Sequence, residues 1–251
     1  MEPWDVYGAR IASKGGSKLE AAKQREVRYI QNHLIDNMSY HTALVDGEER
    51  KVAIINSDNL NEKTIISMPG EDLRHGALVE WMDNRWLITD RDVNTTLYTK
   101  CKMLQCNYLL KWVNSDNQIV EQWTVVSDGT KYLTGEFEDK HFVATRGDTR
   151  LSMIISRTDE VLKLDRQSRF IIDDPFSKEQ LAYVLTKPLR MGWTYNDNGV
   201  FQFVLQEVPT SDYDNLDLKI ADYYKHFPDE YPGRTGEDSI PPEPTGKKVW
   251  F

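Results

Sequence analysis

The chain has 251 residues, a formal net charge of −9 and a hydrophobic fraction of 39%. This length accommodates one large β domain or two small ones, and the composition is that of a folded chain rather than a disordered one. The acidic balance argues against sequence-specific nucleic-acid binding, which needs a cationic face to release counterions from the phosphates. No apolar run of about 18 residues and no signal peptide are present, so the sequence predicts cytoplasmic synthesis without a membrane span.

Residues 1–39 are predicted to form an N-terminal arm and helix. Residues 1–16 contain aromatic side chains followed by glycines, and they are expected to be an extended arm. Ser17 and Glu20 form a capping box, in which each side chain binds an orphan backbone donor. The helical spacing of apolar residues then predicts one long helix over about 17–38.

Residues 40–146 are predicted to form a first β domain, because the hydrophobic period changes from helical to strand-like near Tyr40. Asp46-Gly47 is a strong hairpin signal, and Asp83-Asn84 is predicted to be a second tight turn. The run 98–113 has no internal breaker and is expected to be one long bent strand.

Residues 147–208 are predicted to form a second β segment, with aromatic and aliphatic runs that are separated by acidic turns. Residues 209–251 are assigned to a short helix over 216–227 and a proline-rich tail from Pro228. Proline at this density is incompatible with regular helix or central strand. The tail is therefore expected to be extended.

No motif of metal or covalent catalysis is found, so the sequence predicts a chain that is not an enzyme and has no cofactor. The five histidines lie in no zinc pattern, and the carboxylate pairs, such as Asp90/Asp92 and Asp173/Asp174, are interpreted as solvated turn residues. Asp212, Asp214 and Asp217 lack the glycine and distal glutamate of a calcium loop. Cys101 and Cys106 are expected to be reduced thiols in or beside a core.

Six of the seven tryptophans fall into two groups. Those within predicted strands are interpreted as core residues, namely Trp81, Trp86, Trp112 and Trp123. Those near the termini lie in segments too irregular to build their own core. The candidate interface residues are therefore the terminal aromatics Trp4, Tyr7, Trp250 and Phe251, which are apolar groups able to anchor on another subunit.

Four stretches carry a resemblance to a known family: MPGEDLRHGALVEWMDNRWLITDRD, LYTKCKMLQCNYLLKW, VVSDGTKYLTGE and RFIIDDPFSKEQLAYVLTK. They resemble head–tail connector and head-closure (neck) proteins of tailed bacteriophages with Gram-positive hosts, over most of residues 2–208. These stretches consist of strand and turn residues without a catalytic motif. The resemblance therefore implies a fold and an assembly role, and no active-site residue is carried over.

Together these observations predict a mainly β fold with one long N-terminal helix, SH3-like or related β-barrel or sandwich modules, and extended termini. The resemblance implies a virion protein that forms a ring of about six or twelve copies between portal and tail, with DNA as passing cargo. Its implied partners are the portal or adaptor protein and the tail-terminator or other neck proteins. The alternatives are a minor capsid or tail protein, a nucleic-acid-binding β-barrel and a hydrolase.

Overall fold

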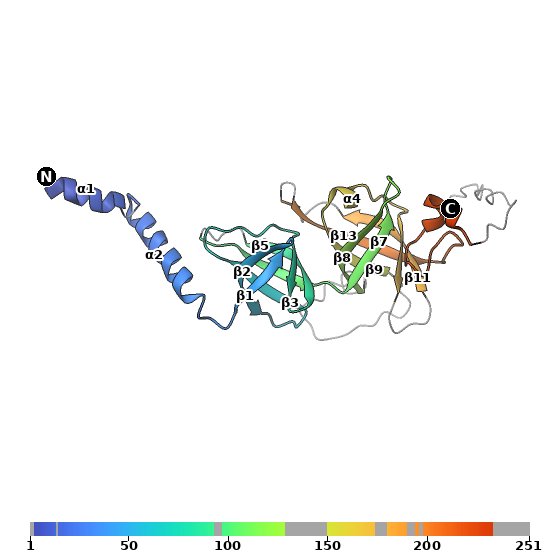
Figure 1. The fold of residues 1–251 in the computed structure, drawn as a ribbon, viewed down its shortest axis with the longest axis horizontal. Coiled ribbons are helices and arrows are strands. Elements are labelled where there is room, and N and C mark those ends of the chain that lie inside the picture. Colours follow the sequence, from blue (N-terminus) through green and yellow to red (C-terminus); the bar gives the residue numbers. More distant parts are fainter. Residues whose placement is uncertain are drawn as a thin grey trace.

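Two β-sheets form most of the structure, a computed structural model that describes residues 3–13, 15–92, 97–128, 150–173, 180–189, 194–195 and 198–232. Figure 1 shows two N-terminal helices, the first sheet and the second sheet following one another along the long axis of the molecule. The expected mainly β fold is confirmed, and it includes a closed barrel.

The first sheet is a closed antiparallel barrel with the strand order β1-β2-β3-β6-β5-β4. Its strands are β1 (Tyr40–Val45), β2 (Glu48–Asn56), β3 (Glu62–Ser67), β4 (Leu78–Trp81), β5 (Asn84–Asp92) and β6 (Lys100–Gln105). Because β1 pairs with both β2 and β4, the barrel leaves no free edge along these strands. Its interior is filled by fully buried side chains such as Val52, Ile65, Ile88 and Met103.

Two hairpins with two-residue turns shape the barrel. Asp46 and Gly47 both have positive φ, and Val45 pairs with Glu48, so the predicted hairpin at this site is confirmed. The second turn lies one residue earlier than predicted. Trp81 pairs with Asn84, and the residues with positive φ are Met82 and Asp83.

The second sheet has the strand order β10-β11-β13-β9-β8-β7, with β12 paired to β13. Its strands are β7 (Tyr108–Val113), β8 (Ile119–Asp128), β9 (Arg150–Ser156), β10 (Arg169–Asp173), β11 (Gln180–Leu189), β12 (Thr194–Tyr195) and β13 (Asn198–Val208), and the short helix α4 (Asp159–Leu162) follows β9. The hydroxyl of Tyr108 donates to the Ile171 carbonyl at 3.0 Å and to the Asp173 carboxylate at 3.2 Å. These bonds join the outer strands β7 and β10, so the sheet curves into a barrel-like body.

The strands are grouped differently from the sequence-based division at residue 146. The first sheet ends at Gln105, and β7 and β8 belong to the second sheet. The run 98–113 is two strands rather than one, because the Asn107 side chain leaves the barrel and binds both backbone groups of Val126, at 2.6 and 2.7 Å. Local spacing shows no such break.

A buried junction joins the barrel to the second sheet. Leu87 and Cys106 pack with Val200 from β13. The Ser156 hydroxyl donates to the Gly76 carbonyl at 2.6 Å, and this hydrogen bond is buried. Ordered contacts of this kind hold the two sheets as neighbours rather than as independent units on a flexible linker.

The N-terminal region contains two helices, which corrects two expectations. α1 (Pro3–Ser13) occupies the segment that was predicted to be extended, with proline at the first helical position where its missing N–H costs nothing. α2 (Lys18–His33) is shorter than the predicted helix over 17–38. It begins as predicted, with Ser17 accepting from the Glu20 amide at 3.1 Å. It ends early because the Asn37 side chain binds the Ser39 amide at 2.9 Å in a turn that leads into β1.

The C-terminal segment 209–232 packs against the second sheet. The expected helix over 216–227 is limited to α5 (Tyr223–His226), and a 3₁₀ turn, η1 (Pro228–Glu230), follows it. Ala221 packs with Ile171 and Ala182 of the sheet. The Tyr223 hydroxyl donates to the Glu230 carboxylate at 2.6 Å, so the start of the tail is part of the folded body. Residues 233–251 of the tail lie outside the described residues.

Both cysteines are free and buried, Cys101 in the barrel core and Cys106 at the junction. Burial raises the pKa of each thiol from 9.0 to about 12. Each thiol has a higher pKa in the folded chain than in the unfolded chain. The protonated thiols therefore contribute their full share to the free energy of unfolding below pH 9, and this share is lost as pH rises toward 12.

We therefore expect the free energy of unfolding to fall above pH 9, by about 1.4 kcal/mol per pH unit for each thiol. Urea unfolding at several pH values would measure this fall. The variant C101A/C106A should show a shallower fall between pH 9 and 11, and an unchanged slope would contradict the assignment. Burial and the nearby Asp173 carboxylate also raise the pKa of Tyr108 to about 12, and this contribution should persist in the variant.

Candidate assembly interface

The two N-terminal helices form an arm, residues 3–33, that packs on no other part of the described chain. No residue of α2 is buried, and every α1 side chain whose exposure is described is exposed. Figure 1 shows both helices leading away from the barrel. Isolated helices of this length are marginally stable in water, and most helical stability in proteins comes from tertiary packing. An arm built this way needs a surface to pack on.

Two of the predicted interface residues lie on this arm. Trp4 is 77% exposed and Tyr7 is 57% exposed, and their rings make an edge-to-face contact with centroids 5.9 Å apart. Their spacing of three places them on one helical face. The structure therefore brings Trp4 and Tyr7 together as an exposed aromatic pair. Trp250 and Phe251 lie outside the described residues.

α2 has a basic and aromatic face that the sequence analysis did not single out as a site. Lys18, Ala22, Arg25 and Tyr29 are spaced by four, three and four residues, which places them on one side of the helix. Tyr29 is exposed and stacks on His33, with ring centroids 4.2 Å apart. Neither Lys18 nor Arg25 forms an ion pair with any residue that the structure describes.

A groove lies on the barrel beside the β4–β5 hairpin and has a volume of about 420 Å³. Leu44 and Trp81 contribute its apolar surface, and Met82 stands at the hairpin turn with 64% of its surface exposed. Glu49 and Asp83 add negative charge and pair with no cation in the described part of the chain. Sequence reasoning missed the groove because it depends on the pairing of β1 with β4, which are far apart along the chain.

The backbone of Met82 is unusual for its side chain. Met82 has φ 49° and Asp83 has φ 58°, the left-handed conformation at both central residues of a two-residue hairpin turn. Glycine, asparagine and aspartate adopt this conformation readily, whereas methionine is strained there. The turn therefore holds a large flexible apolar side chain in solvent at the expense of local stability.

Of the four tryptophans that were predicted to be core residues, two are buried and two are partly buried. Trp86 and Trp112 are buried, as predicted. Trp81 is partly buried between the barrel core and the groove, and its ring lies 5.1 Å from that of His41. Trp123 packs at the junction under the Arg85 guanidinium, which lies 4.9 Å from the ring centroid.

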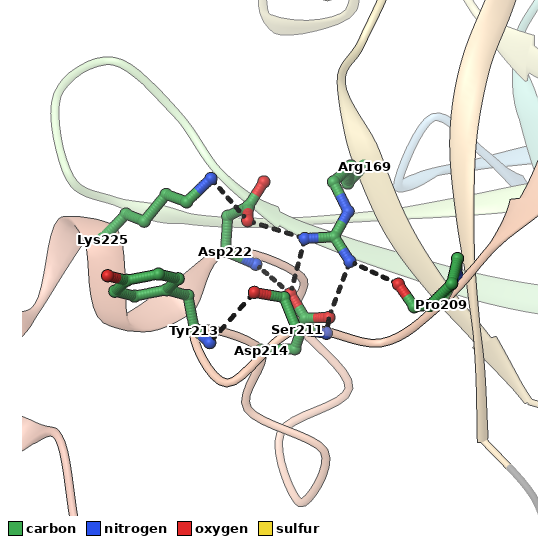
Figure 2. A network of polar contacts seen from close by, with 7 residues as sticks. All are labelled: Arg169, Pro209, Ser211, Tyr213, Asp214, Asp222 and Lys225. Atoms are coloured by element: carbon green, nitrogen blue, oxygen red, sulfur yellow. Dashed lines mark hydrogen bonds and ion pairs between the residues drawn. The ribbon is translucent and has the colours of Figure 1, made fainter. Parts of the chain in front are cut away.

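The acidic C-terminal cluster is a structural clasp (Figure 2). Arg169 of β10 binds the Asp214 carboxylate through both terminal nitrogens, at 2.9 and 3.2 Å, and also binds Asp222 at 2.9 Å. The Asp214 side chain is fully buried, and it also accepts from the backbone amides of Ser211 and Asp222. Its oxygens are thus engaged within the protein, and the cluster fastens segment 209–232 to the sheet.

The remaining acid–base candidates have structural partners or lie outside the described residues. Asp173 binds Lys219 at 2.7 Å in addition to Tyr108. Burial alone would raise the pKa of Asp173, but these two partners lower it overall. Asp174 lies outside the described residues. Among the residues that are described, no group of three His, Cys, Asp or Glu side chains is arranged to hold a metal ion.

No protein-family model, no curated protein and no solved structure matches this chain. In the described residues, no helix is both long and apolar enough to cross a membrane.

Proposed function

We propose that this chain is a structural protein of the bacteriophage neck, which forms a homo-oligomeric ring between portal and tail, joins head to tail and lets DNA pass. Its partners are further copies of itself, the portal or adaptor protein and the tail-terminator or other neck proteins. In this proposal the chain is made in the host cytoplasm and resides in the virion.

The observation that carries the proposal is the unpacked arm with Trp4 and Tyr7 exposed on one face. Burying large apolar side chains provides about 1.5–3 kcal/mol each, and the described part of the chain offers the arm no surface on which to gain it. An arm and its receiving surface are different patches, so the contact can repeat from one copy to the next in a heterologous, head-to-tail way. Heterologous contacts generate closed rings when the rotation between subunits closes.

The charge of the chain suits a ring through which DNA passes. A net charge of −9 repels phosphates and disfavours sticking during passage. Several of the described cations are also paired within the body, such as Arg74 with Asp46 at 3.0 Å and Lys111 with Glu121 at 2.6 Å. A nucleic-acid-binding barrel, the alternative from another class, would instead present a free cationic face and bind DNA in a salt-sensitive way.

Quantitative mass spectrometry of purified virions tests the proposal. We expect the chain at about six or twelve copies per particle, the number that the resemblance to neck proteins implies for a closed ring. Absence from the particle, or a single copy, would contradict it. A much larger copy number would instead indicate a minor capsid or tail protein. Tight DNA binding that weakens steeply with salt would favour the nucleic-acid-binding alternative.

A further inference from the structure

We propose that the arm of one copy docks in the barrel groove of the next copy, with the α2 face of Lys18, Ala22, Arg25 and Tyr29 against the β4–β5 hairpin. This inference rests on the proposed ring function and names the contact that would close the ring. It commits to one occupant, the arm of a second copy of this chain.

Charge complementarity is the first argument. Within α2, Lys18, Lys23, Arg25 and Arg28 outnumber the two acidic residues Glu20 and Glu26. The groove has the opposite balance, since Glu49, Glu80 and Asp83 line it with Arg85 as the one cation. Arg85 is also engaged by Glu80 at 3.5 Å and by the Trp123 ring. The net charge is therefore positive on α2 and negative in the groove lining.

Apolar complementarity is the second argument. Tyr29 is exposed on the arm, and the small side chain of Ala22, two turns earlier on the same face, permits close approach of another surface. The groove offers three apolar side chains for contact, one branched, one aromatic and one flexible: Leu44, Trp81 and Met82. Methionine adapts its shape to a partner, and aromatic side chains bury large areas at interfaces.

The strained turn at Met82 is a third and independent argument. A turn with φ of 49° and 58° would be more stable with asparagine or glycine at this position. Strained residues that persist at a surface often mark a functional site. The left-handed turn places the Met82 side chain at the groove, where a docking helix would contact it.

The arm is long enough to reach a neighbour. At 1.5 Å per residue, the 16 residues of α2 and the 11 of α1 span about 24 Å and 17 Å. Because no residue of α2 is buried, α2 does not fill its own groove. The turn at Asn37 and Ser39 directs the chain into β1 and separates the arm from the barrel.

A synthetic peptide of residues 3–36, added to the isotope-labelled full chain, tests the contact in trans. We expect saturable binding with a dissociation constant below about 1 mM, typical of a weak single contact. Amide resonances of residues 42–49 and 80–85 should shift. No saturation up to this concentration, or shifts confined to another surface, would overturn the inference.

Two variants with matched controls locate the contact. Glu49→Lys should weaken binding roughly five-fold, whereas Glu71→Lys, an equal charge change outside the groove lining, should change it less than about two-fold. Met82→Asn should weaken binding about ten-fold while raising the melting temperature, because asparagine fits the turn. Leu60→Asn removes an exposed apolar side chain elsewhere and should leave binding unchanged.

A charge swap provides the decisive comparison. A peptide carrying Arg25→Glu should bind wild-type chain more weakly and should recover at least part of its affinity on the Glu49→Lys chain. Equal affinity of both chains for this peptide would overturn the docking mode. If virions contain the expected copies while the peptide fails to bind, the docking inference alone is wrong. If virions lack the chain, the proposed function is wrong whatever the peptide does.

Discussion

Replacing Gly76 with alanine is expected to destabilise the protein by more than about 3 kcal/mol, because the new methyl group has no room. Gly76 has φ +82°, and a Cβ there would overlap the Gly199 carbonyl oxygen and lie 2.8 Å from the carbonyl carbon. Both obstacles are backbone at the junction between the sheets, so they cannot rotate away. The Ser156 hydroxyl, which would lie 3.2 Å from the Cβ, is displaced as well.

Urea unfolding of the Gly76→Ala variant measures the effect, with Gly70→Ala as the control. Gly70 has φ +88° but nothing lies within 4 Å of its added Cβ. The free energy of unfolding of the control should therefore fall by only about 1–2 kcal/mol, the cost of placing alanine in a left-handed backbone conformation. We also expect the barrel and the second sheet to unfold in separate steps in Gly76→Ala. Equal losses in both variants would show that the junction is not tightly packed.

The second large effect is expected for Arg169→Ala. Asp214 is fully buried, and removing its cation leaves an uncompensated charge, which typically costs about 3–5 kcal/mol. Segment 209–232 should then detach from the second sheet, because Arg169 also binds the Pro209 carbonyl at 3.1 Å. Hydrogen exchange and limited proteolysis should both increase within this segment.

Lys163→Ala is the matched control for the Arg169 prediction. Lys163 pairs with Glu160 at 2.8 Å on an exposed part of the surface, where water and salt screen the pair, so it contributes little to stability. Its removal should leave the C-terminal segment protected. A variant Arg169→Ala with unchanged exchange in residues 209–232 would mean that the apolar contacts of Ala221 alone hold the segment.

The parts of the fold that could be predicted from the sequence are those set by neighbouring residues. The turn at Asp46-Gly47 follows from residues that accept positive φ, and the start of α2 follows from the Ser17 cap. The exposed aromatic pair Trp4 and Tyr7 was also identified as an interface candidate, although its helical backbone was not.

The parts that could not be predicted depend on residues distant in the chain. Barrel closure needs β1 beside β4, and the assignment of β7 to the second sheet depends on Asn107 binding Val126. The Arg169–Asp214 clasp joins residues 45 positions apart. The groove is equally hidden from the sequence. It forms only when the barrel closes, and one of its lining residues, Met82, has a left-handed backbone that methionine rarely adopts. Residue spacing carries no signal for such encounters.

The most direct test of the central proposal is an averaged electron-microscopy reconstruction of the head–tail junction in purified virions. The proposal predicts a ring of symmetric subunits, each with a closed barrel beside a second curved sheet and with a helical arm reaching the adjacent barrel at its β4–β5 hairpin. A junction whose density accommodates no such subunit, in particles where this chain is absent or located elsewhere, would contradict the proposal.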